Sequence, residues 1–136
     1  MKPRRLQANE LRGRIIDIHS HAGVSVKMYA CQEYPYAATI EGIYYRQTAY
    51  GVDVNVVFPF TADLFFDLGQ LMGGQCVPAR RPISPFPYAV ENELLLREVY
   101  DFCPEYRARF LPFVSVDPGH KVKDQLKKLR KLVARY

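Results

Sequence analysis

The stretch Arg14-Ile15-Ile16-Asp17-Ile18-His19-Ser20-His21 decides how the rest of the chain is interpreted. Its first part is a run of β-branched residues, which is typical of a strand covered on both faces. Asp17, His19 and His21 are spaced by two, so in extended backbone their side chains are expected to leave one face of the strand. Two imidazoles at positions i and i+2 can bind one metal ion from a single strand end.

We therefore predict that His19 and His21 bind a divalent metal ion, zinc in the first place and manganese as the alternative. Asp17 lies one step deeper in the strand and is expected to orient a ligand or a bound water from the second shell. Their position supports this, because active sites of parallel α/β proteins gather where strands end. His120 follows the third predicted strand, on the side of the sheet where it could approach the metal site. We expect it instead to be an exposed residue in the first turn of a helix.

Helices and strands are expected to alternate along the rest of the chain, which makes the fold class α/β. The sequence predicts a strand over 14–19, a helix over 39–50, a strand over 52–58, a helix over 90–103, a strand over 110–116, and a last helix opened by Asp117-Pro118-Gly119. Pro112 is expected to precede the fully paired part of its strand. Such alternation implies a parallel sheet with right-handed crossovers, and periodicity alone leaves open whether the sheet is doubly wound or part of a barrel.

The predicted domain covers residues 14–136, preceded by a tail over 1–13. A long connection over 61–88 interrupts it and contains Gly73-Gly74 and four prolines, so little regular structure is expected in its second half. A loop of this length in a compact domain is usually a lid or a wall of a binding site, with a disordered or family-variable insertion as the alternative.

Composition excludes several classes of protein. A hydrophobic content of 49% is too high for a disordered chain, and no apolar run approaches the length of a membrane span. The basic N-terminus lacks the apolar stretch of a signal peptide, and three cysteines cannot all pair within one chain, so we expect a cytoplasmic protein with reduced thiols. The excess positive charge is concentrated in 121–135, where it alternates around an apolar stripe, so we expect a solvated helix face and no nucleic-acid or membrane partner.

The opening stretch resembles the DxHxH strand of the amidohydrolase superfamily. The likeness continues through Tyr50 to Pro59, which is similar to the second-strand segment of the amidohydrolase-related (amidohydrolase 2) branch. Asn92 and Pro104-Glu105-Tyr106-Arg107 also match that branch, and they lead to Phe113-Val114-Ser115-Val116-Asp117-Pro118. The resemblance spans residues 12 to 136, and its first motif is the specific one.

The resemblance implies a (β/α)8 TIM-type barrel in which a divalent metal, often zinc, acts on a small-molecule substrate. It implies that His19 and His21 are metal ligands, and that two further histidines and an aspartate come from later strands. A barrel needs about 250 residues, so this chain is expected to be a truncated barrel that contains its first three βα units. Because most of the active site is missing from such a piece, we expect no turnover from the chain alone.

The function expected on this basis is that of the N-terminal portion of a metal-dependent hydrolase acting on C–N or C–O bonds. Three alternatives stay open: a non-oxidative decarboxylase of the same family, a TatD-type metal nuclease, and an inactive truncated barrel that serves as an interaction module. Open sheet edges and an uncovered apolar face are expected to favour self-association. The residues expected near that unfinished core are Ile15, Val56, Val57, Val114 and Val116.

Overall fold

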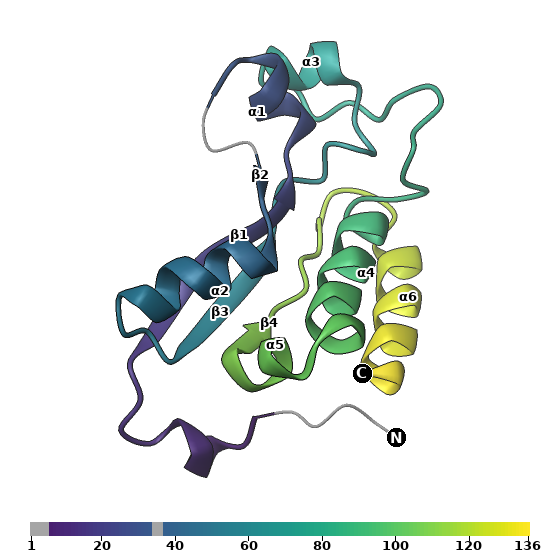
Figure 1. The fold of residues 1–136 in the computed structure, drawn as a ribbon. Coiled ribbons are helices and arrows are strands. Elements are labelled where there is room, and N and C mark those ends of the chain that lie inside the picture. The colour runs from purple at the N-terminus through teal and green to yellow at the C-terminus, as the bar shows by residue number, and fades with distance from the viewer. Residues whose placement is uncertain (1–5, 34–36) are drawn as a thin grey trace.

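The computed structural model describes residues 6–33 and 37–136; part of the predicted tail, residues 1–5, lies outside the described residues. Short helical turns and longer helices alternate with four strands (Figure 1). The elements are η1 (Ala8–Leu11), β1 (Ile16–Val24), α1 (Val26–Ala30), β2 (Ala37–Ala38), α2 (Ile40–Ala49), β3 (Val54–Pro59), α3 (Leu68–Met72), α4 (Ala89–Arg97), η2 (Glu98–Phe102), α5 (Pro104–Arg109), β4 (Phe110–Pro112) and α6 (Val122–Arg135).

The four strands form one mixed, mostly parallel sheet in the order β2-β1-β3-β4. β1 pairs in parallel with β3, and β3 in parallel with β4, so the expected α/β class with three parallel strands is confirmed. The short β2 pairs antiparallel with the end of β1 and was not predicted. The sheet is open, with β2 and β4 at its edges, and no barrel closure is present in the part of the chain that the structure describes.

One face of the sheet is covered by the crossover helices. Ala22 of β1, Val57 of β3 and Phe110 of β4 are buried in the main core beneath these helices. The helices contribute buried side chains to the same cluster: Ile40 and Ile43 from α2, Leu95 and Leu96 from α4, and Leu132 from α6. We call this side the helix-covered face; α4 and α6 lie side by side on it (Figure 1).

Val57 corrects one expectation about the uncovered apolar face. Val57 is fully buried in the main core, whereas Ile15 and Val116 are exposed. Because side chains alternate along a strand, Val57 points towards the helices and its neighbour Phe58 points to the opposite side. The apolar surface left uncovered is therefore smaller than the sequence suggested.

The first crossover helix follows its sequence signals. Thr39 caps α2, its Oγ1 accepting a hydrogen bond from the Gly42 N–H at 3.0 Å. The chain then turns at Gly51, where φ is +76°, a conformation that glycine adopts without a steric penalty. These two signals place α2 within the predicted 39–50 range.

The predicted helix over 90–103 is present as two consecutive segments, α4 and the π-helical turn η2. α4 continues into the π-helical turn η2 at Glu98, and Pro104 starts a separate helix, α5, where we expected only an end. Proline fits the first turn of a helix because that position has no intrahelical partner for an N–H group. Leu94 and Phe102, which were expected on the same side as Leu95 and Val99, are exposed, whereas Leu95 and Val99 are buried.

The third strand and the last helix begin and end differently from the predictions. β4 covers only Phe110–Pro112, and Pro112 is its last paired residue, so the expectation that Pro112 precedes the paired part is wrong. An edge strand tolerates a proline because the missing N–H can face away from the ladder. α6 begins at Val122, because Asp117 instead accepts hydrogen bonds from the Gly119 N–H and from His120 Nδ1 and closes a turn.

The long connection over 61–88 has a small core of its own. Ala62, Phe65 and Phe66 are buried together, and the short helix α3 lies within the segment. Its second half has no helix and only an isolated bridge between Phe66 and Pro78, as the proline content predicted. The loop is therefore folded against the domain in a defined conformation.

Two further expectations concern the whole chain. The described residues contain no helix long and apolar enough to cross a membrane. Cys31, Cys76 and Cys103 are free cysteines in the structure.

Candidate metal centre

A bulge in β1 determines how the motif presents its side chains. Asp17 pairs with Asn55 and Ser20 pairs with Val57, so two residues of β1, Ile18 and His19, lie opposite the single residue between them on β3. Such an extra residue bends a strand and redirects the side chains around it, and it is common beside active sites. The motif therefore does not follow the simple alternation that its spacing suggests.

The bulge separates Asp17 from the two histidines. Ser20 Oγ donates a 2.7 Å hydrogen bond to Asp17 Oδ2, so these two side chains share the helix-covered side. His19 and His21 flank Ser20 in the strand and therefore point the other way. The expectation that all three side chains leave one face is wrong, because strict alternation fails at the bulge.

The two imidazoles meet on the side away from the helices. His19 Nε2 lies 3.0 Å from His21 Nε2, and both residues are exposed. Two Zn–N bonds of about 2.0–2.1 Å at a near-tetrahedral angle would place their nitrogens roughly 3.3 Å apart. The donor atoms and their separation therefore fit two ligands of one ion.

A backbone hydrogen bond orients His21. Its Nδ1 lies 3.0 Å from the carbonyl oxygen of Pro59, the last residue of β3. A carbonyl only accepts, so Nδ1 donates, and in the neutral imidazole the lone pair is then on Nε2. Metal-binding histidines commonly use their second nitrogen in this way, which fixes the ring and its tautomer. In the metal-free protein, His19 Nε2–H then donates to His21 Nε2.

Aromatic rings surround the pair. The ring of Phe58 lies 5.2 Å from His19 and 6.1 Å from His21, centroid to centroid, and the ring of Phe60 lies 5.5 Å from His21. Phe113, after β4, lies 5.5 Å from Phe58. We call this side, with His19, His21, Phe58 and Phe113, the open face. Apolar rings beside a charged site lower the local dielectric constant and strengthen its electrostatic interactions.

Asp17 acts on the strand and not on the imidazole rings. Its Oδ1 accepts from the His19 backbone N–H at 3.0 Å, and its Oδ2 accepts from Gln47 Nε2 of α2 at 2.7 Å. Together with the hydrogen bond from Ser20 Oγ, these contacts connect the Asp17 carboxylate to both sides of the bulge and to α2. Asp17 therefore positions His19 through the main chain.

His120 lies in a different environment from the other two histidines. Its Nδ1 is 3.2 Å from Asp117 Oδ2, and its ring packs edge-on against Phe65 and Phe66 of the long loop. It lies in the turn before α6 and is partly buried, which corrects the expected exposed position in a first helical turn. Across residues 6–33 and 37–136, no group of three or more His, Cys, Asp or Glu side chains could hold a metal ion.

A cavity of about 540 Å³ opens beside His21 on the edge of the sheet. Its walls include Ser20, Arg46, Gln47 and Tyr50, so one side is polar, and Phe60 contributes apolar surface. The size lies within the range of small-molecule sites. A small molecule in this space would lie next to the His21 ring.

Several residues of this centre were not predicted from the sequence. Phe60 and Gln47 contact the motif from elements far along the chain, and the Pro59 contribution is a main-chain oxygen that no side-chain pattern reveals. The only usable signal was Pro59 itself, which was recognised as the end of a strand.

Comparison with known proteins adds no relative. No family model matches this chain, and neither a curated protein nor a solved structure matches it significantly.

Proposed function

We propose that this chain is the N-terminal portion of a metal-dependent hydrolase of the amidohydrolase-related type, in which His19 and His21 bind a divalent metal, zinc or manganese. The observation that carries the proposal is the geometry of His21. Its Nδ1 is held by the Pro59 carbonyl, and its Nε2 lies 3.0 Å from that of His19. This arrangement leaves a lone pair directed at the point where a shared ion would lie.

The winding of the chain agrees with a barrel. Parallel strands β1, β3 and β4 follow one another in chain order, and helices from both crossovers belong to one core on one face. The first half of a doubly wound sheet winds in the same way, with sequential strands and its helices on one face, so the winding agrees with a barrel without excluding that fold. A barrel places all its helices outside and keeps sequential order, and its active site is at the carboxyl ends of the strands. β1 runs from Ile16 to Val24, so His19 and His21 lie within the strand, and the expectation that the strand ends at His19 is wrong.

A divalent metal in such a site supplies Lewis-acid chemistry that activates water for attack on a C–N or C–O bond. The protein supplies the rest from its own residues. His19 and His21 provide nitrogen donors, Phe58 and Phe60 lie beside the imidazole rings, and the cavity beside His21 offers room for a small molecule. Two donors do not complete the three protein ligands that a catalytic zinc site requires, so we expect metal binding without turnover from the chain alone.

Isothermal titration with zinc chloride, repeated with manganese chloride, tests the proposal on the chain and on its three single histidine variants. We expect weak binding, at least about tenfold weaker in His19→Ala and in His21→Ala, since each change removes one of two donors. His120→Ala is the matched control and should bind as the unsubstituted chain does, because His120 pairs with Asp117. Equal affinity and stoichiometry in all four proteins would disprove the shared site.

A second measurement tests whether the chain catalyses a reaction. The chain with zinc or manganese, assayed against esters, lactones, amides and aromatic carboxylates, should show no turnover above the metal alone. Turnover that disappears in His19→Ala would contradict this expectation and would indicate that copies of the chain complete the site between them. Decarboxylation of an aromatic carboxylate without hydrolysis of any ester or amide would replace the hydrolase assignment by a decarboxylase.

A further inference from the structure

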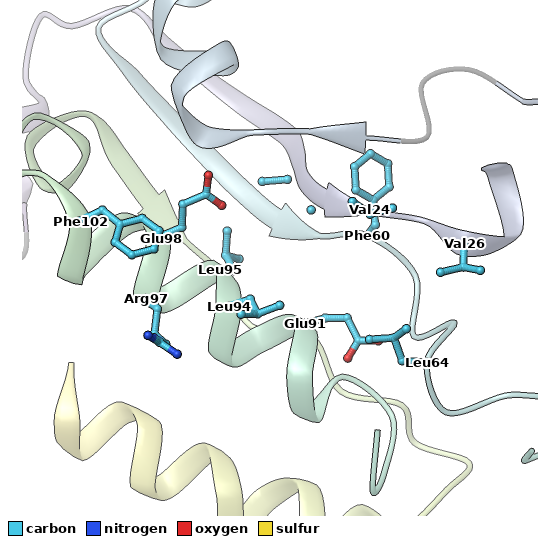
Figure 2. A pocket seen from close by; sticks show the side chains of 12 residues that line it. Val24, Val26, Phe60, Leu64, Glu91, Leu94, Leu95, Arg97, Glu98 and Phe102 are labelled. Atoms are coloured by element: carbon cyan, nitrogen blue, oxygen red, sulfur yellow. The ribbon is translucent and has the colours of Figure 1, made fainter. Parts of the chain in front are cut away.

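A second cavity lies on the helix-covered face, and Phe60 borders both this cavity and the one beside His21. It has a volume of about 380 Å³ and extends between the end of β1 and the length of α4 (Figure 2). Ala22 and Leu95 belong both to its lining and to the main core, which places it beneath the helices. The volume falls within the range of small-molecule sites. We call it the α4 cavity.

The walls of the α4 cavity are mainly apolar. Val24 is the last residue of β1 and Val26 the first of α1. Phe60 and Leu64 follow β3, and Phe102 is the last residue of η2. Three of the lining side chains stay largely exposed: Val24, Leu94 and Phe102. Large apolar side chains grouped around an opening favour an apolar ligand, because such a ligand would remove them from water.

Glu91 is the unusual group in this lining. Both of its carboxylate oxygens are buried, and neither makes a hydrogen bond of standard geometry among the described residues, although the backbone N–H groups of Glu91, Leu64 and Val90 act to lower its pKa. Figure 2 shows its side chain at the end of the cavity next to Leu64. Buried polar atoms are nearly always paired, so a buried carboxylate without such a bond requires an explanation.

None of the described residues that line the cavity places a cation beside Glu91. Arg97 also borders the cavity, but Figure 2 shows its side chain directed away from the opening and towards α6. The other acid of the lining, Glu98, already accepts a hydrogen bond from the Ile40 N–H at 2.9 Å and so caps the neighbouring helix. Burial raises the pKa of both Glu91 and Glu98, and at Glu91 it outweighs the nearby N–H groups of Leu64 and Val90.

We propose that the α4 cavity binds a small apolar amine, whose hydrocarbon body packs against Leu94, Leu95 and Phe60 and whose ammonium group pairs with Glu91. An ammonium has three donors and a positive charge, so it can pair with a buried carboxylate and favours its ionised form. The apolar walls exclude water from that pair, which strengthens it. This site shares no metal ligand with the histidine pair, so it stands independently of the proposed hydrolase.

The test uses the full chain and three probes: benzylamine, benzyl alcohol as the neutral molecule with the same ring, and methylamine as the cation without the ring. Binding is followed by amide chemical shifts in two-dimensional NMR. We expect benzylamine to bind at least about tenfold more tightly than either control and to shift the amides of Val24, Leu64 and Leu94. Equal binding of benzyl alcohol, or shifts confined to other regions, would overturn the proposal.

Single substitutions test whether the Glu91 carboxylate is the group that pairs with the ammonium of benzylamine. Glu91→Gln keeps the shape and removes the charge, and it should weaken benzylamine by about tenfold while leaving benzyl alcohol unchanged. Glu93→Gln on the same helix is the matched control, because Glu93 pairs with Lys128 of α6 and does not line the cavity; it should bind benzylamine normally. Unchanged affinity in Glu91→Gln would refute the assigned pairing. Leu94→Ala should weaken benzylamine and benzyl alcohol alike, and failure to weaken either would refute the assigned cavity.

Discussion

The two faces of the sheet differ in what covers them. Side chains of the helix-covered face, such as Val57 and Phe110, are removed from water by α2, α4 and α6. On the open face, His19 and His21 are exposed and have aromatic rings beside them. Hydrophobic burial, which is the main stabilising term in folding, is therefore concentrated on one side. The histidines on the other side can change with little effect on stability, which is the condition for a functional surface.

The largest expected difference between the two faces is tested by truncating two phenylalanines, Phe110 in β4 and Phe113 just after it. Phe110 is 1% exposed and lies in the main core, whereas Phe113 is 52% exposed on the open face. We expect Phe110→Ala to lower the free energy of unfolding by about 3–5 kcal/mol, and Phe113→Ala by less than about 1 kcal/mol. Urea unfolding followed by circular dichroism measures both. Similar losses in the two variants would show that the open face is also a packed core.

An intermediate effect is expected at Asp17, which links the two faces. Asp17→Asn replaces one of its two acceptor oxygens by a donor, facing Ser20 Oγ, Gln47 Nε2 or the His19 N–H. The free energy of unfolding should fall by about 1–3 kcal/mol, because a buried donor loses its acceptor.

Zinc affinity separates the two roles of Asp17. It should fall less in Asp17→Asn than in His19→Ala, since Asp17 touches the main chain of His19 and not its ring. Asp124→Asn, an exposed carboxylate in the first turn of α6, serves as the control for stability. A loss of zinc affinity in Asp17→Asn as large as that in His19→Ala would mean that the carboxylate binds the ion.

The smallest expected effect concerns pH and the buried carboxylate of Glu91. Burial raises its pKa in the folded state, with Asp63 contributing repulsion. The folded protein therefore holds this proton more tightly than the unfolded chain, so the contribution to stability is present below the unfolded pKa and is lost as pH rises through the folded pKa. Glu91→Gln cannot ionise, so it should gain stability relative to the unsubstituted chain between pH 4 and pH 8. Urea unfolding at both pH values, with Glu93→Gln as control, detects the trend; a constant difference would contradict it.

The sequence predicted those parts of the fold that depend on local signals. Thr39 and Gly51 bound α2, and the β-branched runs identified β1 and β3, because capping and strand preference act over a few residues. The elements that were not predicted, or were predicted with wrong bounds, depend on contacts between distant segments. β2 exists only as the partner of the end of β1, and α6 starts late because Gln125 bonds the backbone of Asp117. No pattern in one segment encodes such contacts.

The candidate site likewise combines features with a local sequence signal and features that depend on contacts between distant segments. The spacing of His19 and His21 predicted that the two would act together, and their Nε2 atoms lie 3.0 Å apart. The bulge that moves Asp17 to the other side is a property of pairing with β3, since it appears only as a mismatch between the two strands. The charge of Glu91 is visible in the sequence, but its lack of a hydrogen bond of standard geometry among the described residues is a fact of packing.

The π-helical turn of Glu98–Phe102 makes the α4 cavity sensitive to insertions and deletions. A π turn arises when a helix carries one residue more than its α-helical neighbours need, and Glu98 and Phe102, at its two ends, both line the cavity. A homologous chain lacking one residue here would continue as a regular α-helix. The phenylalanine would then be rotated by about 100° around the helix axis, away from the opening. Among relatives of this protein, the length of this segment should therefore separate chains that keep the end wall of the cavity from chains that lose it.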